Sequence, residues 1–530
     1  MQVTRLRLRL LLAVLVSISL VAGFIGLTPA EWNKPASSGQ SKLRGVMNVS
    51  DLEDKCARIF SSPYFVRHIS VCKDGPSGSC WLQAVGIAKP LSAPPEVIEK
   101  VRTVFLCTMS PDGRSLFAAS RDGPIFHWDV INNRYLGDFA DFLKFKRQTG
   151  RVVDLRFSRN GRWLVARHTS GEIVLCDWSK QQVVRRFTDI GGAVGSVDIS
   201  DDGRYLVTTC LANSPLLWNT VTGETLCYRA PVHYRHWSSV RITSGGHMFA
   251  LGSPSGSVID IIETASEGLR CRIRGDMEIF RFRFTPDGRM LVVAREGAIS
   301  IWDLCENKEV LRIQGDKVSG EVVPDTGDLV IYNDGKLYLL PHSLWLSKWG
   351  EEPESHLDAG VLENAWNDLA ASDSARAFQA MRLFLSHPKQ ALRFLEKALV
   401  VMPLSGEETE QVLKYIEQLA AAEPSARQEA AEQLRRFGWR AFPLIKQARE
   451  RHRDPEARRR CSLLIRELQS EDSHRLRELR ALEILEYVRS QPAVALVRKL
   501  ADGVSDAPLT IAARESLSRI SPMSPSAVTP

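Results

Sequence analysis

The sequence predicts a multidomain β + α protein, in which a region of repeated short strands precedes a region of helices. Two turn signals recur together about every forty residues through the first two thirds of the chain. After Trp349, apolar residues recur instead at spacings of three and four, which is typical of amphipathic helices. An uncharged stretch near the amino terminus indicates a targeting or membrane segment. These observations define the expected domains.

The amino-terminal stretch comes first. Leu10 to Leu27 form a run of eighteen uncharged residues behind Arg5, Arg7 and Arg9. This length lies between a secretory signal and a membrane-spanning helix, so a signal anchor and a cleaved signal peptide both stay open for residues 1–27. The basic flank places the chain after Leu27 outside the cytoplasm. We therefore expect a membrane-anchored, mainly extracytoplasmic protein, or a secreted or periplasmic one after cleavage, with residues 28–54 as a flexible tether.

The strand region begins with a clear example of the repeated pattern, SPDGRSLFAASRDGPIFHWD, at residues 110–129. In its first turn Pro111 presets φ, Asp112 can bond its own backbone and Gly113 accepts a positive φ. Asp122-Gly123 is a second hairpin signal. The first signal returns at residues 158–162, 200–204, 243–247, 285–289 and 323–327, and the second at Ser170-Gly171, Asn213-Ser214, Ser255-Gly256, Glu296-Gly297 and Asp334-Gly335.

A third pattern closes most units with an aromatic and an acidic or amide residue, as HWD, CDW, LWN and IWD. With these residues in place, residues 101–340 resemble the WD-repeat family, whose repeat forms one four-stranded blade of a β-propeller. The candidate structural positions of the blades are Asp112, Gly113, Asp122, Gly123, Trp128, Asp129, Gly161, Gly171, Trp178, Gly203, Trp218, Gly256, Asp287, Gly288, Gly297, Trp302, Asp303, Asp334 and Gly335.

The resemblance implies a WD-repeat-like β-propeller over residues 55–345. Six units are visible and residues 69–87 suggest another, so we expect about seven blades, with six and eight still open. The Gly-His dipeptide that often opens such repeats is missing, so the buried Asp-His-Ser-Trp hydrogen-bond set of many members cannot form. We expect these blades to depend on apolar packing. If Trp128, Trp218 and Trp302 lie in blade cores, replacing one by Ala should cost about 3–5 kcal/mol.

A helical region follows a linker at residues 346–360 and spans residues 361–521, before a disordered tail at 522–530. Residues 425–468 resemble HEAT repeats, through Arg427, Ala430, Ala431, Leu434, Gly438, Ala441, Pro443 and Leu444. Asp454 is expected to cap a helix that starts at Pro455. A propeller followed by a HEAT-like array, behind an amino-terminal hydrophobic segment, resembles a family of bacterial exported or membrane-tethered WD-repeat proteins with no known reaction.

The sequence contains only weak motifs for metal binding, cofactor binding or catalysis. His233 and His236 have a two-ligand spacing but no third ligand at a suitable interval, so we assign no metal, and no cofactor-binding or catalytic residue is expected either. Cys72 and Cys80 could form a disulfide in an oxidising compartment. The net charge of +7 comes largely from carboxy-terminal arginines. The run Arg449, Arg451, Arg453, Arg458, Arg459 and Arg460 is interleaved with acids and is interpreted as a solvated helix face.

These observations predict a non-catalytic scaffold for protein–protein interaction, tethered to a membrane by its amino-terminal helix. It would bind protein partners through the propeller rim and a groove of the helical array. The alternative is a hydrolase or lyase with an active site in the propeller channel. Nucleic acid is not an expected partner, since the charge balance is modest for a chain of 530 residues.

Overall fold

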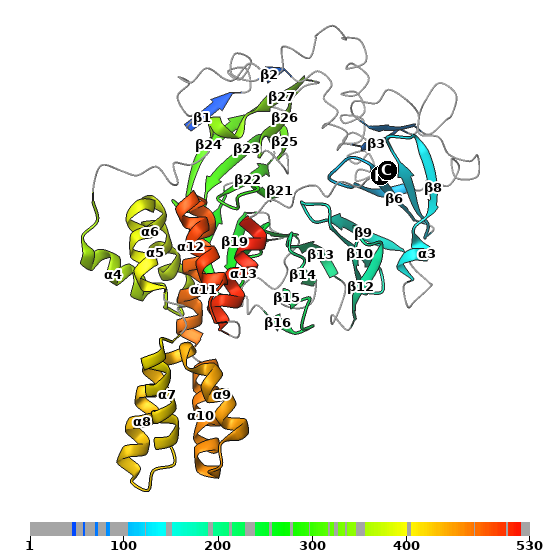
Figure 1. Ribbon diagram of the computed structural model, residues 1–530. Coiled ribbons are helices and arrows are strands. Elements are labelled where there is room, and N and C mark those ends of the chain that lie inside the picture. Colours follow the sequence, from blue (N-terminus) through cyan, green and yellow to red (C-terminus); the bar gives the residue numbers. More distant parts are fainter. Residues whose placement is uncertain are drawn as a thin grey trace. The chain divides into compact units, whose positions relative to one another are not determined.

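The computed structural model describes residues 45–48, 57–58, 69–72, 81–84, 104–121, 123–144, 151–188, 194–210, 215–227, 239–253, 257–275, 279–295, 297–315, 318–322, 327–333, 336–345, 356–399, 404–470, 472–504 and 507–520. The chain divides into two compact units, Met1–Ser347 and Lys348–Pro530. The first unit contains sheets and the second contains helices (Figure 1). The predicted order of a β region and an α region is therefore confirmed.

Five sheets of the first unit each consist of four consecutive antiparallel strands, and one of them gains a further strand. Their strands are β5 (Val104–Met109), β6 (Ser115–Ser120), β7 (Ile125–Asp129) and β8 (Arg134–Asp138); β9 (Val152–Phe157), β10 (Trp163–His168), β11 (Ile173–Asp177) and β12 (Gln182–Phe187); β13 (Val194–Ile199), β14 (Tyr205–Cys210), β15 (Leu216–Asn219) and β16 (Thr225–Cys227); β17 (Ser239–Ile242), β18 (Met248–Gly252), β19 (Val258–Glu263) and β20 (Leu269–Arg274); β21 (Ile279–Phe284), β22 (Met290–Arg295), β23 (Ala298–Asp303) and β24 (Lys308–Gln314).

Amino-terminal strands complete the remaining sheets. Strand β2 (Ala57–Arg58) pairs with β27 (Lys336–Leu340), next to β26 (Leu329–Asn333) and β25 (Ser319–Val322). Strands β3 (Ile69–Cys72) and β4 (Trp81–Ala84) form a two-stranded sheet. Strand β1 (Gly45–Asn48) adds to β24 in parallel, within the segment expected to be a tether. Seven sheets are thus present in the described part of the chain, in agreement with about seven blades.

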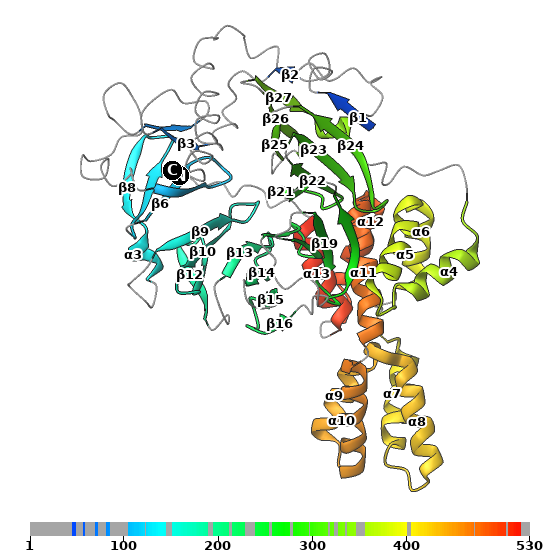
Figure 2. The ribbon, with the colours of Figure 1, turned by 180° about the vertical axis from the view of Figure 1, so that it is seen from behind.

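The sheets are arranged as propeller blades. The first strand of each sheet contacts the first strand of the next, from β5 to β9, β13, β17, β21 and β25 in turn. This places the first strands at the centre and the later strands outside (Figures 1 and 2). Blades that pack on both faces bury consecutive residues of a strand, and every residue of β19 is accordingly buried. The fold is the β-propeller predicted from the sequence.

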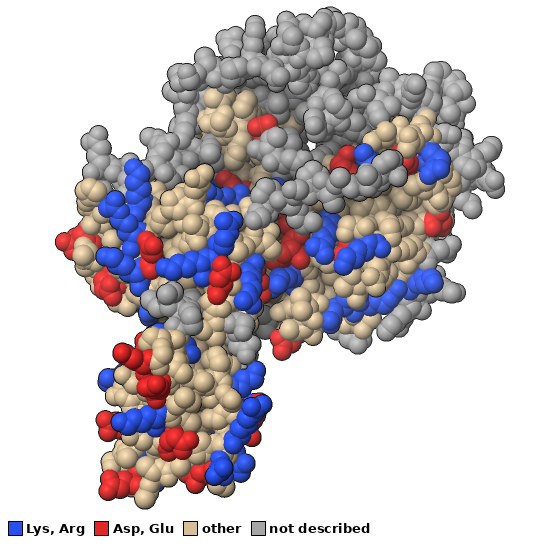
Figure 3. All heavy atoms as spheres, viewed as in Figure 1, with Lys and Arg blue, Asp and Glu red and all other residues tan. Residues whose placement is uncertain are grey.

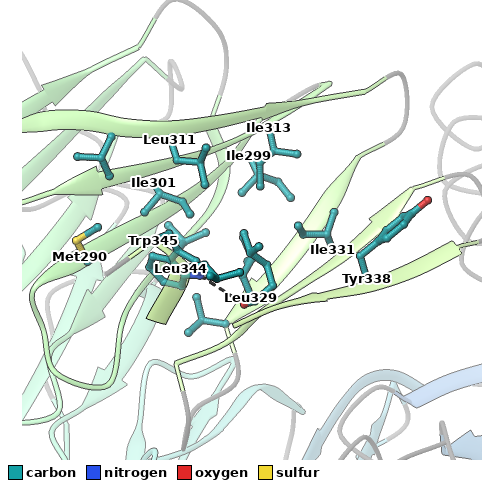
Figure 4. Close-up of a cluster of buried hydrophobic side chains, with 14 of the residues drawn as sticks. Met290, Ile299, Ile301, Leu311, Ile313, Leu329, Ile331, Tyr338, Leu344 and Trp345 are labelled. Atoms are coloured by element: carbon teal, nitrogen blue, oxygen red, sulfur yellow. Dashed lines mark hydrogen bonds between the residues drawn. The ribbon is translucent and has the colours of Figure 1, made fainter. Parts of the chain in front are cut away.

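The hydrophobic core lies between neighbouring blades. One cluster joins the β21–β24 sheet to the β25–β27 sheet through Ile299, Ile301 and Leu329 (Figure 4). The fully buried Trp345, which follows the short helix η5 (His342–Leu344), packs into the same cluster. Similar clusters join the β9–β12 sheet to both of its neighbours. Apolar packing between blades was expected because the buried polar set of many WD repeats is missing.

The second unit contains ten helices in its described residues. They are α4 (Ala359–Asp368), α5 (Ser374–Ser386), α6 (Pro388–Ala398), α7 (Gly406–Gln418), α8 (Pro424–Phe437), α9 (Phe442–Arg451), α10 (Pro455–Ser470), α11 (Asp472–Val488), α12 (Gln491–Ala501) and α13 (Pro508–Ile520). Helices α7–α10 pack together around one core, whereas α11 returns to contact α5 and α6 (Figure 2). The packing is therefore not strictly sequential along the chain.

Local signals for helix starts agree with the structure where they can be compared. The backbone amides of Glu456 and Ala457 donate to Asp454 Oδ1 at 2.8 and 3.1 Å, which confirms Asp454 as the cap of α10. Ser405 and Glu408 form a reciprocal capping box at the start of α7. The likeness of this region to HEAT repeats stays a prediction, because neither the caps nor the packing distinguishes HEAT repeats from other helical arrays.

Several sequence predictions fall on residues outside the described part of the chain. These are the hydrophobic segment 10–27, most of the tether 28–54, and the residues Cys80, Asp122, His233, His236, Gly256, Asp334 and Gly335. Among the described residues, none of the helices has the length and apolar character needed to cross a membrane. The predicted anchor, its orientation and the disulfide of Cys72 with Cys80 are therefore not tested.

Candidate functional site

The turn between the first and second strands of a blade is built around a hydroxyl group. In the β13–β14 turn, Ser200 Oγ donates to Asp202 Oδ1 at 2.6 Å, and the amide of Tyr205 donates back to Ser200 Oγ at 3.1 Å. The amide of Arg204 donates to Asp202 Oδ1 at 3.0 Å. The amide of Gly203, whose φ is 74°, donates to the Ser200 carbonyl at 2.9 Å. Side chain and backbone thus fix one turn geometry.

The same turn recurs in other blades. A hydroxyl, a carboxylate or amide oxygen and a glycine occupy matching places in Ser110-Asp112-Gly113, Ser158-Asn160-Gly161 and Thr285-Asp287-Gly288. The glycine φ angles lie between 71° and 74° in these turns and in the related turn at Gly246. There, Thr243 Oγ1 donates to the Met248 carbonyl instead, at 3.0 Å. Sequence reasoning identified Asp and Gly but missed the hydroxyl, although Ser or Thr opens each of these five copies.

The acidic residue of the third pattern forms another turn, between the third and fourth strands. Asp303 Oδ1 accepts the amides of Cys305 and Glu306 at 2.8 and 3.0 Å, and Asp129 Oδ1 accepts the amide of Asn132 at 3.0 Å. Asp177 and Asn219 do the same in their blades. The neighbouring aromatic residues differ in depth, since Trp128 and Trp218 are buried whereas Trp178 and Trp302 are half-buried.

The second turns, at the opposite ends of these strands, are less fully described. Gly123, Gly171 and Gly297 have φ angles of 110°, 86° and 67°, which glycine adopts without strain. The amide of Gly171 donates to the His168 carbonyl at 3.0 Å and closes the β10–β11 turn.

Backbone hydrogen bonds tie the first and third turns together on one face in five of the described blades. The carbonyl of Arg204, directly after the first turn, accepts the amide of Thr220 in the third turn at 2.8 Å. In four other blades an equivalent backbone amide donates to an equivalent carbonyl. These pairs, amide first, are Val130 and Arg114, Trp178 and Arg162, Thr264 and His247, and Leu304 and Arg289. We call the surface formed by these first and third turns the turn face. Its backbone is held by the same bonds in five blades.

Contacts between neighbouring blades extend this network. Asp201 accepts from Arg159 Nε at 3.0 Å and from the amide of Asn160 at 3.1 Å, which joins two first turns. Burial raises the pKa of Asp201, and the adjacent Arg159 opposes that rise. A Cβ on Gly203 would lie 2.2 Å from Trp163 Cε2, so neighbouring turns are in close contact. The turns therefore form a continuous and rigid arc.

Arginines of the β9–β12 sheet make further joints between blades. Arg167 donates to the Gly195 carbonyl at 3.3 Å, and Arg185 donates to the Val221 carbonyl at 3.0 Å. On the other side, Arg186 donates to the Leu143 carbonyl at 2.6 Å and pairs with Glu172. These arginines therefore form hydrogen bonds and an ion pair within the propeller. Their positive charge does not by itself define a surface for an anionic ligand.

Exposed apolar side chains lie at the tips of the third turns. Ile131 and Val221 occupy equivalent places, two residues after Asp129 and Asn219, and are 60% and 66% exposed. Exposed residues of other character, Ser179 and Ala265, occupy the same place in two further blades. A rigid arc thus presents one variable side chain from each of these blades. Such an arrangement suits a surface that contacts another protein, because few groups need to be ordered on binding.

The structure offers little support for a reaction centre in its described part. No three His, Cys, Asp or Glu side chains of these residues gather closely enough to hold a metal ion. A shallow depression is lined by Arg281, Phe282, Arg283, Val292, Ala294, Gly320 and Val322. Its lining contains neither a nucleophile nor an acid–base pair. His127 and Cys176 are structural, packed among aromatic and aliphatic side chains.

Comparison with known proteins agrees with the propeller. A WD repeat-containing protein 26 homolog of Arabidopsis thaliana is 25% identical over 225 residues, which cover 41% of this chain and 37% of that protein. Protein HIR1 of Coccidioides immitis is 24% identical over 177 residues, 28% of this chain and 16% of that protein. This chain is similar to WD-repeat proteins. It spans well under half the length of either relative, and no protein-family profile matches it.

The similarity covers less than half of this chain in either comparison. Both relatives come from eukaryotes, so the expected bacterial family stays a prediction, as does the HEAT-like character of the helical unit. The sequence-predicted blade residues Asp112, Asp129, Asp287 and Asp303 lie in turns on the turn face, and Gly113, Gly161, Gly203 and Gly288 lie beside them. They fix the backbone of that face and do not converge on one point.

Proposed function

We propose that the protein is a non-catalytic scaffold that binds a protein partner through the turn face of its propeller. The observation that supports this proposal is the rigid arc of turns with exposed apolar residues at its tips. Ile131 and Val221 are far more exposed than Ile125 and Leu217, which lie in the strands that precede their turns. Large apolar side chains on a pre-ordered backbone are typical of the centres of protein interfaces. Similarity to WD-repeat proteins supports the same class of function.

Affinity purification from the native membrane tests the proposal. We expect the double variant Ile131→Asp/Val221→Asp to lose the partners that the wild-type protein retains, because two carboxylates would be desolvated at the interface. The matched control is Leu136→Asp/Val184→Asp, which changes two exposed apolar residues of the outer strands β8 and β12. Retention of every partner by the first variant, or equal loss in both, would count against the turn face.

We also propose that residues 10–27 hold the protein at a membrane with the propeller outside the cytoplasm. The support is the uncharged run of eighteen residues behind three arginines. In membrane fractionation, the protein should be released by detergent and not by high salt, and protease added outside spheroplasts or cells should digest it. Replacing Leu15 and Leu20 by Arg should prevent stable membrane association. Release of the wild-type protein by salt alone would contradict an embedded anchor.

A further inference from the structure

The corner between α9 and α10 concentrates positive charge. Residues 449–460 contain six arginines, no lysine and three carboxylates, which leaves a formal charge of +3 without the histidine. Arg451 lies in the last turn of α9, Arg453 in the connection and Arg458 in the first turn of α10. All three side chains are exposed. In Figure 3 the basic side chains gather along one edge of the lobe formed by α7–α10.

The three carboxylates of this corner are already engaged. Asp454 accepts two backbone amides as the cap of α10. Glu456 accepts from Arg460 Nε at 2.9 Å and lies 3.8 Å from Arg459, and Glu450 accepts from Arg449 at 3.1 Å. Arg451, Arg453 and Arg458 make no side-chain hydrogen bond or ion pair with another described residue. Three arginines are therefore left without a counter-charge among the described residues.

The position of Arg458 strengthens this argument. The first turn of a helix has a partial positive charge, so a cation there is disfavoured and an anion is favoured. Arg458 thus adds to the positive end of α10 instead of offsetting it. Nearby, His452 Nε2 lies 3.3 Å from Glu417 Oε2, so this carboxylate of α7 also has a neighbour. The corner is electrostatically complementary to an anionic group.

We infer that Arg451, Arg453 and Arg458 bind an acidic segment of a partner protein. Guanidinium groups form paired hydrogen bonds with carboxylates, and the cluster contains only arginines. A membrane surface is a poorer match, because clusters that bind anionic lipid usually contain four to eight basic residues, whereas three of the six arginines here are paired with acids of the same corner. The inference rests on the proposed scaffold function, since it gives the chemistry of one partner, and it adds a second surface to the turn face.

Binding of a fluorescent peptide of eight glutamates to the full-length protein in detergent, measured at low ionic strength, tests the inference. We expect Arg451→Glu/Arg453→Glu/Arg458→Glu to weaken binding about tenfold or more, and the corresponding Gln variant to weaken it less. The matched control is Arg393→Glu/Lys397→Glu/Arg498→Glu, which reverses three exposed basic residues of α6 and α12 without a described partner. The control should change affinity by no more than about twofold.

Two outcomes would overturn the inference. One is equal peptide affinity of the wild-type protein and the α9–α10 variant, and the other is an equal loss of affinity in the control. If the variant keeps its peptide affinity but loses binding to phosphatidylserine vesicles, the arginines are assigned to lipid. Peptide binding and the partner purification with Ile131 and Val221 are separate measurements. Failure of the arginine corner is therefore distinguishable from failure of the scaffold proposal.

Discussion

At the scale of single residues, depth of burial separates tryptophans that look alike in the sequence. Trp128 is fully buried and lies against Phe126 and Tyr135, whereas Trp302 is half-buried. We expect Trp128→Ala to lower the free energy of unfolding of the propeller by about 3–5 kcal/mol and Trp302→Ala to lower it less. Denaturant unfolding followed by circular dichroism measures both. Equal losses would contradict the difference in packing between the two blades.

His127 gives the propeller a predicted sensitivity to acid. Its ring stacks on Phe117 with centroids 4.4 Å apart, and burial lowers the pKa of His127 from 6.5 to about 4, with Asp129 acting in the opposite direction. Between pH 6.5 and 4, His127 therefore binds a proton more readily in the unfolded chain than in the folded chain. The stabilising contribution of neutral His127 is therefore complete above pH 6.5 and is lost as the pH falls towards 4.

Replacing His127 by Phe tests this expectation, because the stacked ring is retained and the titrating group is removed. The melting temperature of the wild-type propeller should fall between pH 6.5 and 4 more steeply than that of the variant. Thermal melts at several pH values in one ionic strength provide the comparison. Parallel pH profiles of the two proteins would show that His127 titrates alike in the folded and unfolded chains.

At the scale of elements, the repeated first turns offer an internal comparison. Gly161 and Gly203 have the same φ of 74° in turns of the same kind. An added Cβ would lie 3.1 Å from Pro111 Cδ at Gly161, but 2.2 Å from Trp163 Cε2 at Gly203. Gly161→Ala should cost about 1–2 kcal/mol for the left-handed backbone. Gly203→Ala should cost about 1–3 kcal/mol more, because a packed ring must also move.

Urea unfolding of the two glycine variants measures this difference. Gly406→Ala is a suitable control, since Gly406 begins α7 without a positive φ and a Cβ there would meet nothing within 4 Å. The control should be neutral or slightly stabilising. If Gly203→Ala and Gly161→Ala prove equally costly, the close packing of neighbouring turns does not limit the substitution.

The turns also show how far local sequence determines this fold. Pro, Asp and Gly predicted where the chain reverses, because their conformational preferences act within four residues. The repetition of those turns predicted consecutive blades, about seven in number, with six and eight left open. The role of Ser200 was missed, because its hydroxyl has a definite partner only after Asp202 and Tyr205 are in place. The repeated Ser or Thr was nevertheless visible in the sequence.

Elements that depend on distant partners could not be predicted in the same way. Strand β1 has four residues and pairs with Leu311 to Gln314, so nothing in its own sequence indicates the partner. The joints made by Arg167 and Arg185 end on backbone carbonyls, which every residue possesses. The exposed tips Ile131 and Val221 were likewise missed, because the sequence predicts a turn there but not which side chains stay uncovered.

At the scale of the whole molecule, the two compact units are expected to unfold as separate cooperative transitions. A buried arginine makes this testable. Arg480 of α11 is 1% exposed and donates from Nη1 to the carbonyls of Leu369 and Ala371, at 2.6 and 2.7 Å. These carbonyls lie in the connection between α4 and α5. One side chain therefore joins helices separated by the whole α7–α10 lobe.

Arg480→Met should destabilise the helical unit by about 2–4 kcal/mol, because two carbonyls would lose a charged donor in a buried place. Arg427 on α8 is the matched comparison: it also donates to two loop carbonyls, those of Ala421 and Ala422, but is only half-buried. Arg427→Met should therefore cost less, since water can replace the lost donor. In calorimetry, Arg480→Met should lower one transition and Trp128→Ala the other, whereas a single transition shifted by both variants would mean that the units unfold together.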